Sequence, residues 1–195
     1  LSPAQEEVDT LRDFLNEGGK WFGLHGTNAL IEFVGEMQIV DGLEIPGKTD
    51  TPNKNPELMK LLGSRFIAHP PNMTIKVKVN DKSHPITKDL EDFEIFDEPY
   101  YCEFSDGIKI LLESRYTDDA DAYVSSSWKE DIPRPQMYLH KVGKGSVLYL
   151  MLGHCRGKYD MRPFMDECPV DRGGWESEVF YELLRRGIKW GINKI

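Results

Sequence analysis

The fold is decided by the stretch Gly19-Lys20-Trp21-Phe22-Gly23-Leu24-His25-Gly26, which has the pattern of a short buried strand that ends in a sharp turn. A second apolar run, Val147-Leu148-Tyr149-Leu150-Met151-Leu152-Gly153, leads in the same way into His154. A continuous apolar run of this length favours a strand that is covered on both faces, as in an α/β sheet. A turn at a strand end can aim one side chain into a site, so both histidines are candidate site residues.

The composition predicts one globular domain over residues 1–195. The chain is 39% hydrophobic, carries a net charge of -9 and is long enough to bury an ordinary core. The acidic balance argues against nucleic acids and anionic membranes as partners, because both require clustered Lys and Arg. No stretch approaches the roughly 20 apolar residues that a membrane-spanning helix needs.

The three cysteines, Cys102, Cys155 and Cys168, show no C-x-x-C spacing. An odd number without that spacing predicts neither a disulfide framework nor a zinc ribbon. The compartment therefore stays open: cytoplasmic, or periplasmic or secreted if a signal peptide has been removed. The chain opens on a helix start at Ser2 and Pro3 rather than on a methionine, and we expect that N-terminal strands are missing.

Apolar spacing predicts an alternation of helices and strands. Helices are expected over residues 3–17, 55–62 and 178–195. Strands are expected over residues 20–24, 74–79, 95–98 and 108–112, and a hairpin over residues 137–152. Residues 27–55 have little pattern, and we expect a short helix followed by a long loop that could act as a lid.

The two strand-end histidines could share one site. If their strands are parallel neighbours, both imidazoles emerge at the same edge of the sheet. One could then act as a base while the other orients or protonates a substrate. Glu98 or Asp97 could supply a carboxylate partner, but only one of these neighbours can face the site in an extended segment. The alternative is that each histidine merely caps a turn and that the carboxylates are solvated.

The same side chains are the candidate ligands of a divalent metal such as zinc. His25, Glu98 and His154 would supply three donors, and His69 or His84 could add a fourth. The chain has no H-E-x-x-H motif, so metal binding is the less favoured interpretation at this point.

Several motifs, taken in their order, resemble those of the ThuA-like (trehalose utilisation) family, whose fold is similar to that of class I glutamine amidotransferases. The motifs lie at residues 18–26, 62–66, 69–70, 84–87, 97–100, 143–145 and 152–154. The resemblance implies an α/β, flavodoxin-like three-layer sandwich with a mostly parallel sheet and with additional strands before Ser2. Residues 31–54 match no part of the family pattern and are a candidate insertion or lid.

The resemblance also implies chemistry. Amidotransferases carry cysteine at the turn where this chain has His25, so glutaminase activity is not expected. The family implies carbohydrate catabolism, with a di- or oligosaccharide or its keto derivative as the substrate. The residues that we expect to act in catalysis, or to bind a metal, are His25, Glu98 and His154. From their side-chain chemistry, Arg65, His69 and Tyr100 are expected to bind the substrate.

Three classes of function remain in competition. The leading interpretation is an enzyme with hydrolase-like acid-base or metal-assisted chemistry on a saccharide. The others are a sugar-binding or scaffolding domain without catalysis and a metal-dependent hydrolase. A small saccharide is the expected partner, and a homo-oligomer is left open. Trp21, on a buried strand, is expected to belong to the core.

Overall fold

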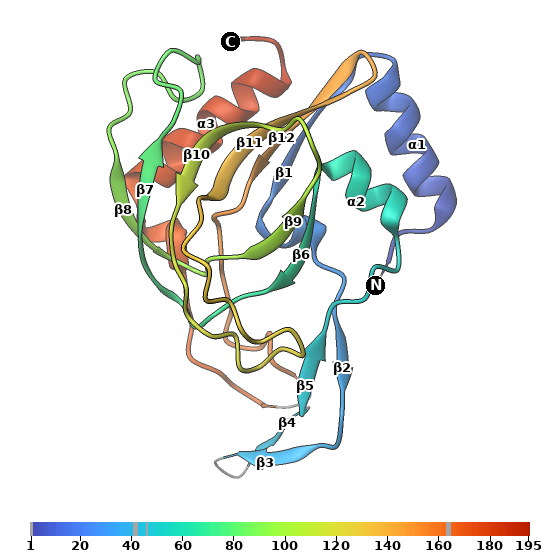
Figure 1. Ribbon diagram of the computed structural model, residues 1–195, viewed down its shortest axis with the longest axis vertical. Helices are drawn as coiled ribbons and strands as arrows, with labels where there is room; N and C mark the ends of the chain where they lie inside the picture. Colours follow the sequence, from blue (N-terminus) through green and yellow to red (C-terminus); the bar gives the residue numbers. More distant parts are fainter. Residues whose placement is uncertain (1, 41–42, 46, 163–164) are drawn as a thin grey trace.

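The computed structural model describes residues 2–40, 43–45, 47–162 and 165–195 (Figure 1). Its helices are α1 (Gln5–Asn16), α2 (Pro56–Leu62) and α3 (Glu178–Gly191), with two 3-10 turns, η1 (His25–Asn28) and η2 (Gly173–Glu176). Its strands are β1 (Lys20–Leu24), β2 (Glu32–Val34), β3 (Gln38–Val40), β4 (Leu43–Ile45), β5 (Lys48–Asp50), β6 (Ser64–Ala68), β7 (Met73–Val79), β8 (Phe93–Asp97), β9 (Tyr101–Phe104), β10 (Lys109–Ser114), β11 (Arg134–Val142) and β12 (Gly145–Leu150).

Six of these strands form one mixed sheet in the order β1-β12-β11-β10-β7-β8. β1 and β12 run parallel, with Lys20 opposite Ser146 and Leu24 opposite Leu150. The remaining neighbours in the sheet are antiparallel. The α/β class is confirmed, but the expectation of a mostly parallel sheet is corrected to a mixed one. The physical reason is the tight hairpin between β11 and β12, since parallel neighbours need a crossover of a dozen or more residues.

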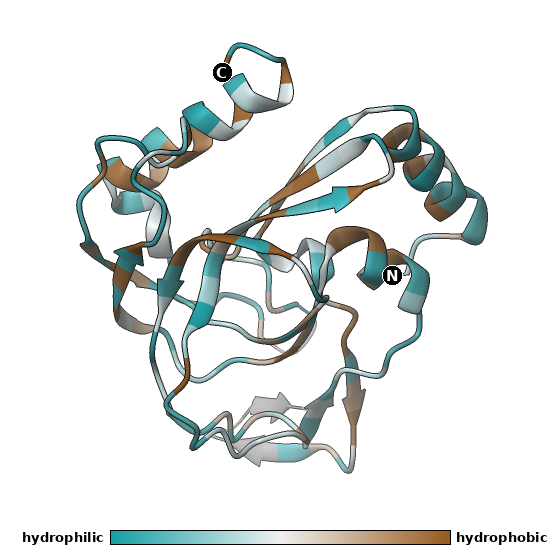
Figure 2. Cartoon of the chain, turned by 45° about the horizontal axis from the view of Figure 1, so that its top comes forward, coloured by the Kyte–Doolittle hydropathy of each residue, from teal (hydrophilic) through white to brown (hydrophobic). Residues whose placement is uncertain are grey.

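Helices cover both sides of this sheet: α1 and α2 lie on one side and α3 on the other (Figure 1). α3 buries Phe180, Leu183, Gly187 and Trp190, which are three or four residues apart and therefore share one helix face. Figure 2 shows hydrophobic and hydrophilic residues alternating along this C-terminal helix. Within the described ranges, no helix combines the length and the apolar character needed to cross a bilayer.

Residues 27–55 are more regular than the expected loop. β2 pairs with β5 and β3 with β4, both antiparallel, and together they form a narrow arm that extends from the body (Figure 1). The short helix expected here is the 3-10 turn η1. Local pairing satisfies the backbone groups of the arm without an amphipathic repeat, which explains why the sequence pattern did not reveal it. Its role as an insertion or lid stays a prediction.

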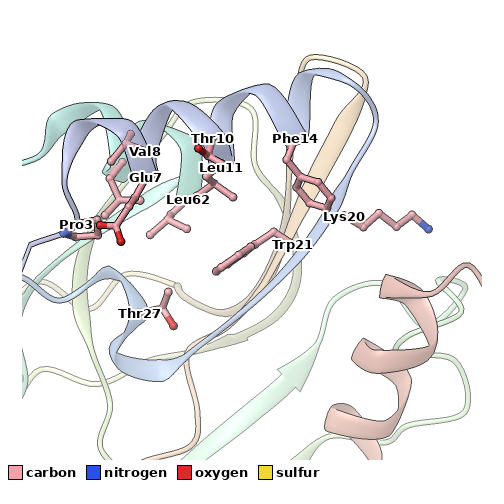
Figure 3. Close-up of a pocket in the computed structure, with 11 residues that line it drawn as sticks. Pro3, Glu7, Val8, Thr10, Leu11, Phe14, Lys20, Trp21, Thr27 and Leu62 are labelled. Carbon is pink, nitrogen blue, oxygen red and sulfur yellow. The ribbon is translucent and has the colours of Figure 1, made fainter.

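An apolar groove of about 560 Å³ lies between α1, α2 and β1. In Figure 3, Phe14 of α1 and Trp21 of β1 approach each other along this groove. The expectation that Trp21 is a core residue is wrong, since the residue is 38% exposed. The reason is that β1 is an edge strand, so one flank of Trp21 is uncovered. The lining of the groove includes neither His25 nor His154.

The packing of α1 against the β11–β12 hairpin predicts a severe effect of one added methyl group. A Cβ atom at Gly145 would lie 2.3 Å from the carbonyl oxygen of Gly19 and 2.4 Å from that of Leu15, and neither backbone atom can rotate away. We expect Gly145→Ala to lower the free energy of unfolding by about 1–3 kcal/mol. Gly191→Ala is the control, because nothing lies within 4 Å of its Cβ position. Urea denaturation of both variants makes the comparison, and equal midpoints would contradict the packing described.

Candidate functional site

The parallel pair β1 and β12 brings His25 and His154 together. His25 follows directly after β1, and His154 lies four residues beyond the end of β12. Their ring centroids are 5.7 Å apart, with the two rings nearly perpendicular. The expected convergence of the two strand ends is therefore present, while the roles of the two imidazoles stay predictions.

His25 lies at a strained turn. Its φ is 41°, in the left-handed region that residues other than glycine rarely adopt. Its Nδ1 lies 2.8 Å from the carbonyl oxygen of Met151, and its Nε2 lies 2.9 Å from the hydroxyl of Tyr100. A carbonyl can only accept, so the hydrogen of Nδ1 is donated to Met151. Strained backbone of this kind is concentrated at functional sites.

Glu98 is the centre of the cluster. One carboxylate oxygen lies 3.2 Å from Nε2 of His25. The other lies 3.2 Å from Nε2 of His69 and 3.3 Å from Nδ1 of His154. Three imidazoles that are distant in sequence thus surround one carboxylate. The contacts of Glu98 with His25 and His154 were expected, and His69 joins them.

Asp97, the neighbour of Glu98, faces the other way and holds the site together. It is 0% exposed. Its oxygens accept hydrogen bonds from the backbone N–H groups of Glu98, Gly153, His154 and Gly174, at 2.8–3.1 Å. It therefore joins the end of β8, the segment after β12 and the turn η2. Of the two carboxylates that the sequence offered, Glu98 contacts the histidines and Asp97 positions them.

Burial and pairing shift the pKa values of this cluster in opposite directions. Burial alone would raise the pKa of Glu98, but hydrogen bonds from His154 and His25 outweigh it and hold that pKa below its ordinary value. Burial also opposes the charging of His154, yet the contact with Glu98 raises the pKa of this imidazole. Burial lowers the pKa of His69 despite the charge of Glu98. Burial likewise raises the pKa of Asp97, against its N–H donors.

Two of the expected substrate-binding residues belong to the cluster and one does not. Tyr100 stacks on His25 with ring centroids 4.4 Å apart, and His69 contacts Glu98. Arg65 is held elsewhere, because its guanidinium pairs with Glu103 and donates to the carbonyl of Thr51. His84 lies away from the cluster as well, beside Ile86.

Other residues of the site were not among the predicted site residues. The ring of Tyr123 lies 5.0 Å from that of His69, and the ring of Phe66 lies 4.4 Å from that of Tyr100. Asp171 places an oxygen 3.7 Å from Nε2 of His154 and accepts a hydrogen bond from Asn72. None of these residues lies at the end of an apolar strand, the feature by which His25 and His154 were found.

The cluster also contains a set of metal-ligating atoms. One atom each from His25, Glu98 and His154 lie within 4.8 Å of one another, and no other such group of three occurs among the described residues. Nε2 of His154 is buried without a hydrogen-bond partner. These donors fit a divalent transition metal, for which two imidazoles and a carboxylate are common ligands.

The pairing with Glu98 predicts how His154 titrates in protein treated with a chelator. Glu98→Gln removes the charge that raises the pKa of His154 and leaves the burial that lowers it, so we expect this pKa to fall. In the wild type, the raised pKa stabilises the fold below the ordinary value near 6.5, and this contribution is lost as pH rises through the folded value. NMR titration of the imidazole protons measures the change, with His140 as an internal reference. An unchanged pKa for His154 would contradict the pairing.

The four donors to Asp97 predict a loss of stability when its carboxylate is removed. Asp97→Ala leaves buried N–H groups without an acceptor, and we expect the free energy of unfolding to fall by at least about 2 kcal/mol. Asp97→Asn keeps one acceptor oxygen and is expected to lose less. Urea denaturation ranks the three proteins, and the reverse order of the two variants would contradict the role described.

Comparison with known proteins adds the family. A family model described as ThuA, trehalose utilisation, matches residues 46–168, which include Glu98 and His154 but not His25. No curated protein sequence gives a match.

Solved structures share the fold at low sequence identity. A ThuA-like protein from Bacteroides uniformis superposes with a TM-score of 0.62 at 19% identity, covering 97% of this chain and 65% of that one. A ThuA-like protein from Parabacteroides merdae superposes with a TM-score of 0.59 at 18% identity, covering 98% of this chain and 66% of that one. The chain thus spans just under two thirds of the length of these two structures. A cytoplasmic protein from Salmonella typhimurium superposes with a TM-score of 0.52 at 11% identity, covering 97% of this chain and 62% of that one. Because the family model covers more than half of the sequence, this chain belongs to the ThuA (trehalose utilisation) family.

Proposed function

We propose that this protein acts on a saccharide by acid-base chemistry at His25, Glu98 and His154. Membership of the ThuA family supports a role in carbohydrate metabolism. The observation that carries the proposed chemistry is the convergence of His25, His69 and His154 on the carboxylate of Glu98 at 3.2–3.3 Å.

This arrangement suits proton transfer at the hydroxyl or carbonyl groups of a sugar. Imidazole can either donate or accept a proton near neutral pH, and a neighbouring carboxylate fixes its tautomer and orientation. His69 and Tyr100 would contact the substrate, since both lie beside the catalytic imidazoles. A di- or oligosaccharide, or its keto derivative, is the substrate class that we propose.

Glutaminase activity is not part of the proposal. Thioester formation requires a cysteine thiolate as the nucleophile, and the turn after β1 carries His25 instead. Cys155 follows His154 directly, but its side chain is exposed, outside the half-buried histidine cluster.

A second candidate is a sugar-binding or scaffolding domain without catalysis. Low exposure of the cluster favours it: the side chains of Glu98, His154 and His25 are 11%, 13% and 15% exposed. So little surface leaves a substrate limited access unless the surrounding loops rearrange.

Turnover of a panel of glycosides and 3-keto-glycosides tests the two candidates. If the imidazoles act as acid and base, His25→Ala and His154→Ala lower the rate by at least about 100-fold. His140→Ala is the control, because His140 lies on β11 and contacts the carbonyl of Lys60 rather than the cluster. Equal rates for all variants would remove the cluster from the mechanism. Saturable sugar binding in calorimetry without any product would favour the second candidate.

A further inference from the structure

We propose that His25, Glu98 and His154 bind a divalent transition-metal ion of the zinc class, with a coordination position left open. This inference rests on the proposed function only because both concern the same cluster of side chains. The evidence for it is the direction in which the histidine ring nitrogens face. Hydrogen bonds alone would require a hydrogen on each nitrogen that faces Glu98, and the backbone contacts of two rings place that hydrogen on the opposite nitrogen.

The tautomer of His25 is fixed by the backbone. Since Nδ1 donates its hydrogen to the carbonyl of Met151, Nε2 of the neutral ring carries a lone pair. In this neutral form the lone pair lies 3.2 Å from a carboxylate oxygen of Glu98, and two acceptors at this distance repel each other unless a proton or a cation lies between them. The hydroxyl of Tyr100 lies 2.9 Å from this nitrogen, but a hydrogen bond from it does not bridge the nitrogen to Glu98.

His69 repeats the pattern. Its Nδ1 lies 2.8 Å from the carbonyl oxygen of Pro70 and must donate to it, so the lone pair of Nε2 also faces Glu98, at 3.2 Å. Metal-ligating histidines typically donate their second N–H to a backbone carbonyl or a carboxylate, which is the arrangement that Met151 and Pro70 provide. A cation between the lone pairs and the carboxylate converts the repulsion into coordination.

His154 supplies the next donor. One of its nitrogens lies 3.3 Å from Glu98, and the other is buried without a hydrogen-bond partner, with an oxygen of Asp171 3.7 Å away. Nδ1 is the nitrogen that faces Glu98 and would bind the ion, while Nε2 faces Asp171. Asp171 would contact this imidazole rather than the ion and would orient the ring.

The separations between donors are near those around a tetrahedral ion. With metal–ligand distances of about 2.0–2.1 Å, two ligands of a tetrahedral zinc ion lie about 3.3–3.4 Å apart. One oxygen of Glu98 lies 3.2 Å from His25 and the other lies 3.3 Å from His154, and one ligand atom from each of the three residues lies within 4.8 Å of the other two. Two imidazoles and one carboxylate are the donor set of zinc sites that keep a fourth position for water or substrate. Nitrogen donors favour zinc and its neighbours over magnesium, which prefers oxygen ligands.

Zinc chloride added to chelator-treated protein tests the site, with calorimetry for affinity and elemental analysis for stoichiometry. We expect one zinc per chain and no comparable binding of magnesium. Glu98→Gln, His25→Ala and His154→Ala are each expected to weaken binding by more than about 100-fold, beyond the loss typical of an outer partner. His140→Ala and Cys155→Ser are the controls and are expected to bind as the wild type does, since neither residue belongs to the cluster.

NMR of the wild type keeps the test independent of whether the variants fold. Added zinc is expected to shift the imidazole signals of His25 and His154 and to leave those of His84 and His140 in place. Unshifted signals, no saturable binding, or binding that Glu98→Gln retains and Cys155→Ser loses would overturn the inference. Zinc binding without turnover of any saccharide would leave the site standing and remove the proposed function. Turnover by a protein that binds no zinc would remove the site and leave the proposed function standing.

Discussion

The hydrogen bonds that converge on Asp97 are the interaction on which the arrangement of the site depends. This buried carboxylate accepts N–H groups from its own neighbour Glu98, from Gly153 and His154, and from Gly174. β8 and β12 are not neighbours in the sheet, so no ladder of backbone hydrogen bonds sets their relative position. Asp97 supplies that connection, and the side chains on either side of it, Glu98 and His154, meet as a result.

The electrostatics of the cluster follow from this geometry. A single carboxylate, Glu98, is shared by three imidazoles in surroundings where few of the polar atoms reach water. Its charge raises the pKa of His154, while burial prevails at His69 and lowers the pKa there. Chemically identical side chains thus acquire different proton affinities from their distance to one anion and from their access to solvent.

Sequence patterns predicted the parts of this site that depend on local structure. An apolar strand ending in a tight turn identified His25 and His154, and strand alternation required that Asp97 and Glu98 face opposite ways. The direction of the strands was not predictable, because the apolar run of β12 reflects coverage on both faces and contains no information on its neighbours. The position of Arg65 outside the cluster was not predictable, because its partner, Glu103, is fixed by the pairing of β6 with β9, which no local pattern encodes. Tyr123 and Asp171 reach the site through tertiary contacts alone.

The position of β1 in the sheet has a mechanical consequence for the site. β12 is the only strand that pairs with β1 among the described residues, and the two share five residue pairs. Opening of this single ladder at the border of the sheet would separate the two imidazoles while the five other strands keep their pairing. The local stability of this short segment, and not only that of the whole domain, therefore bears on how often the histidine cluster is assembled.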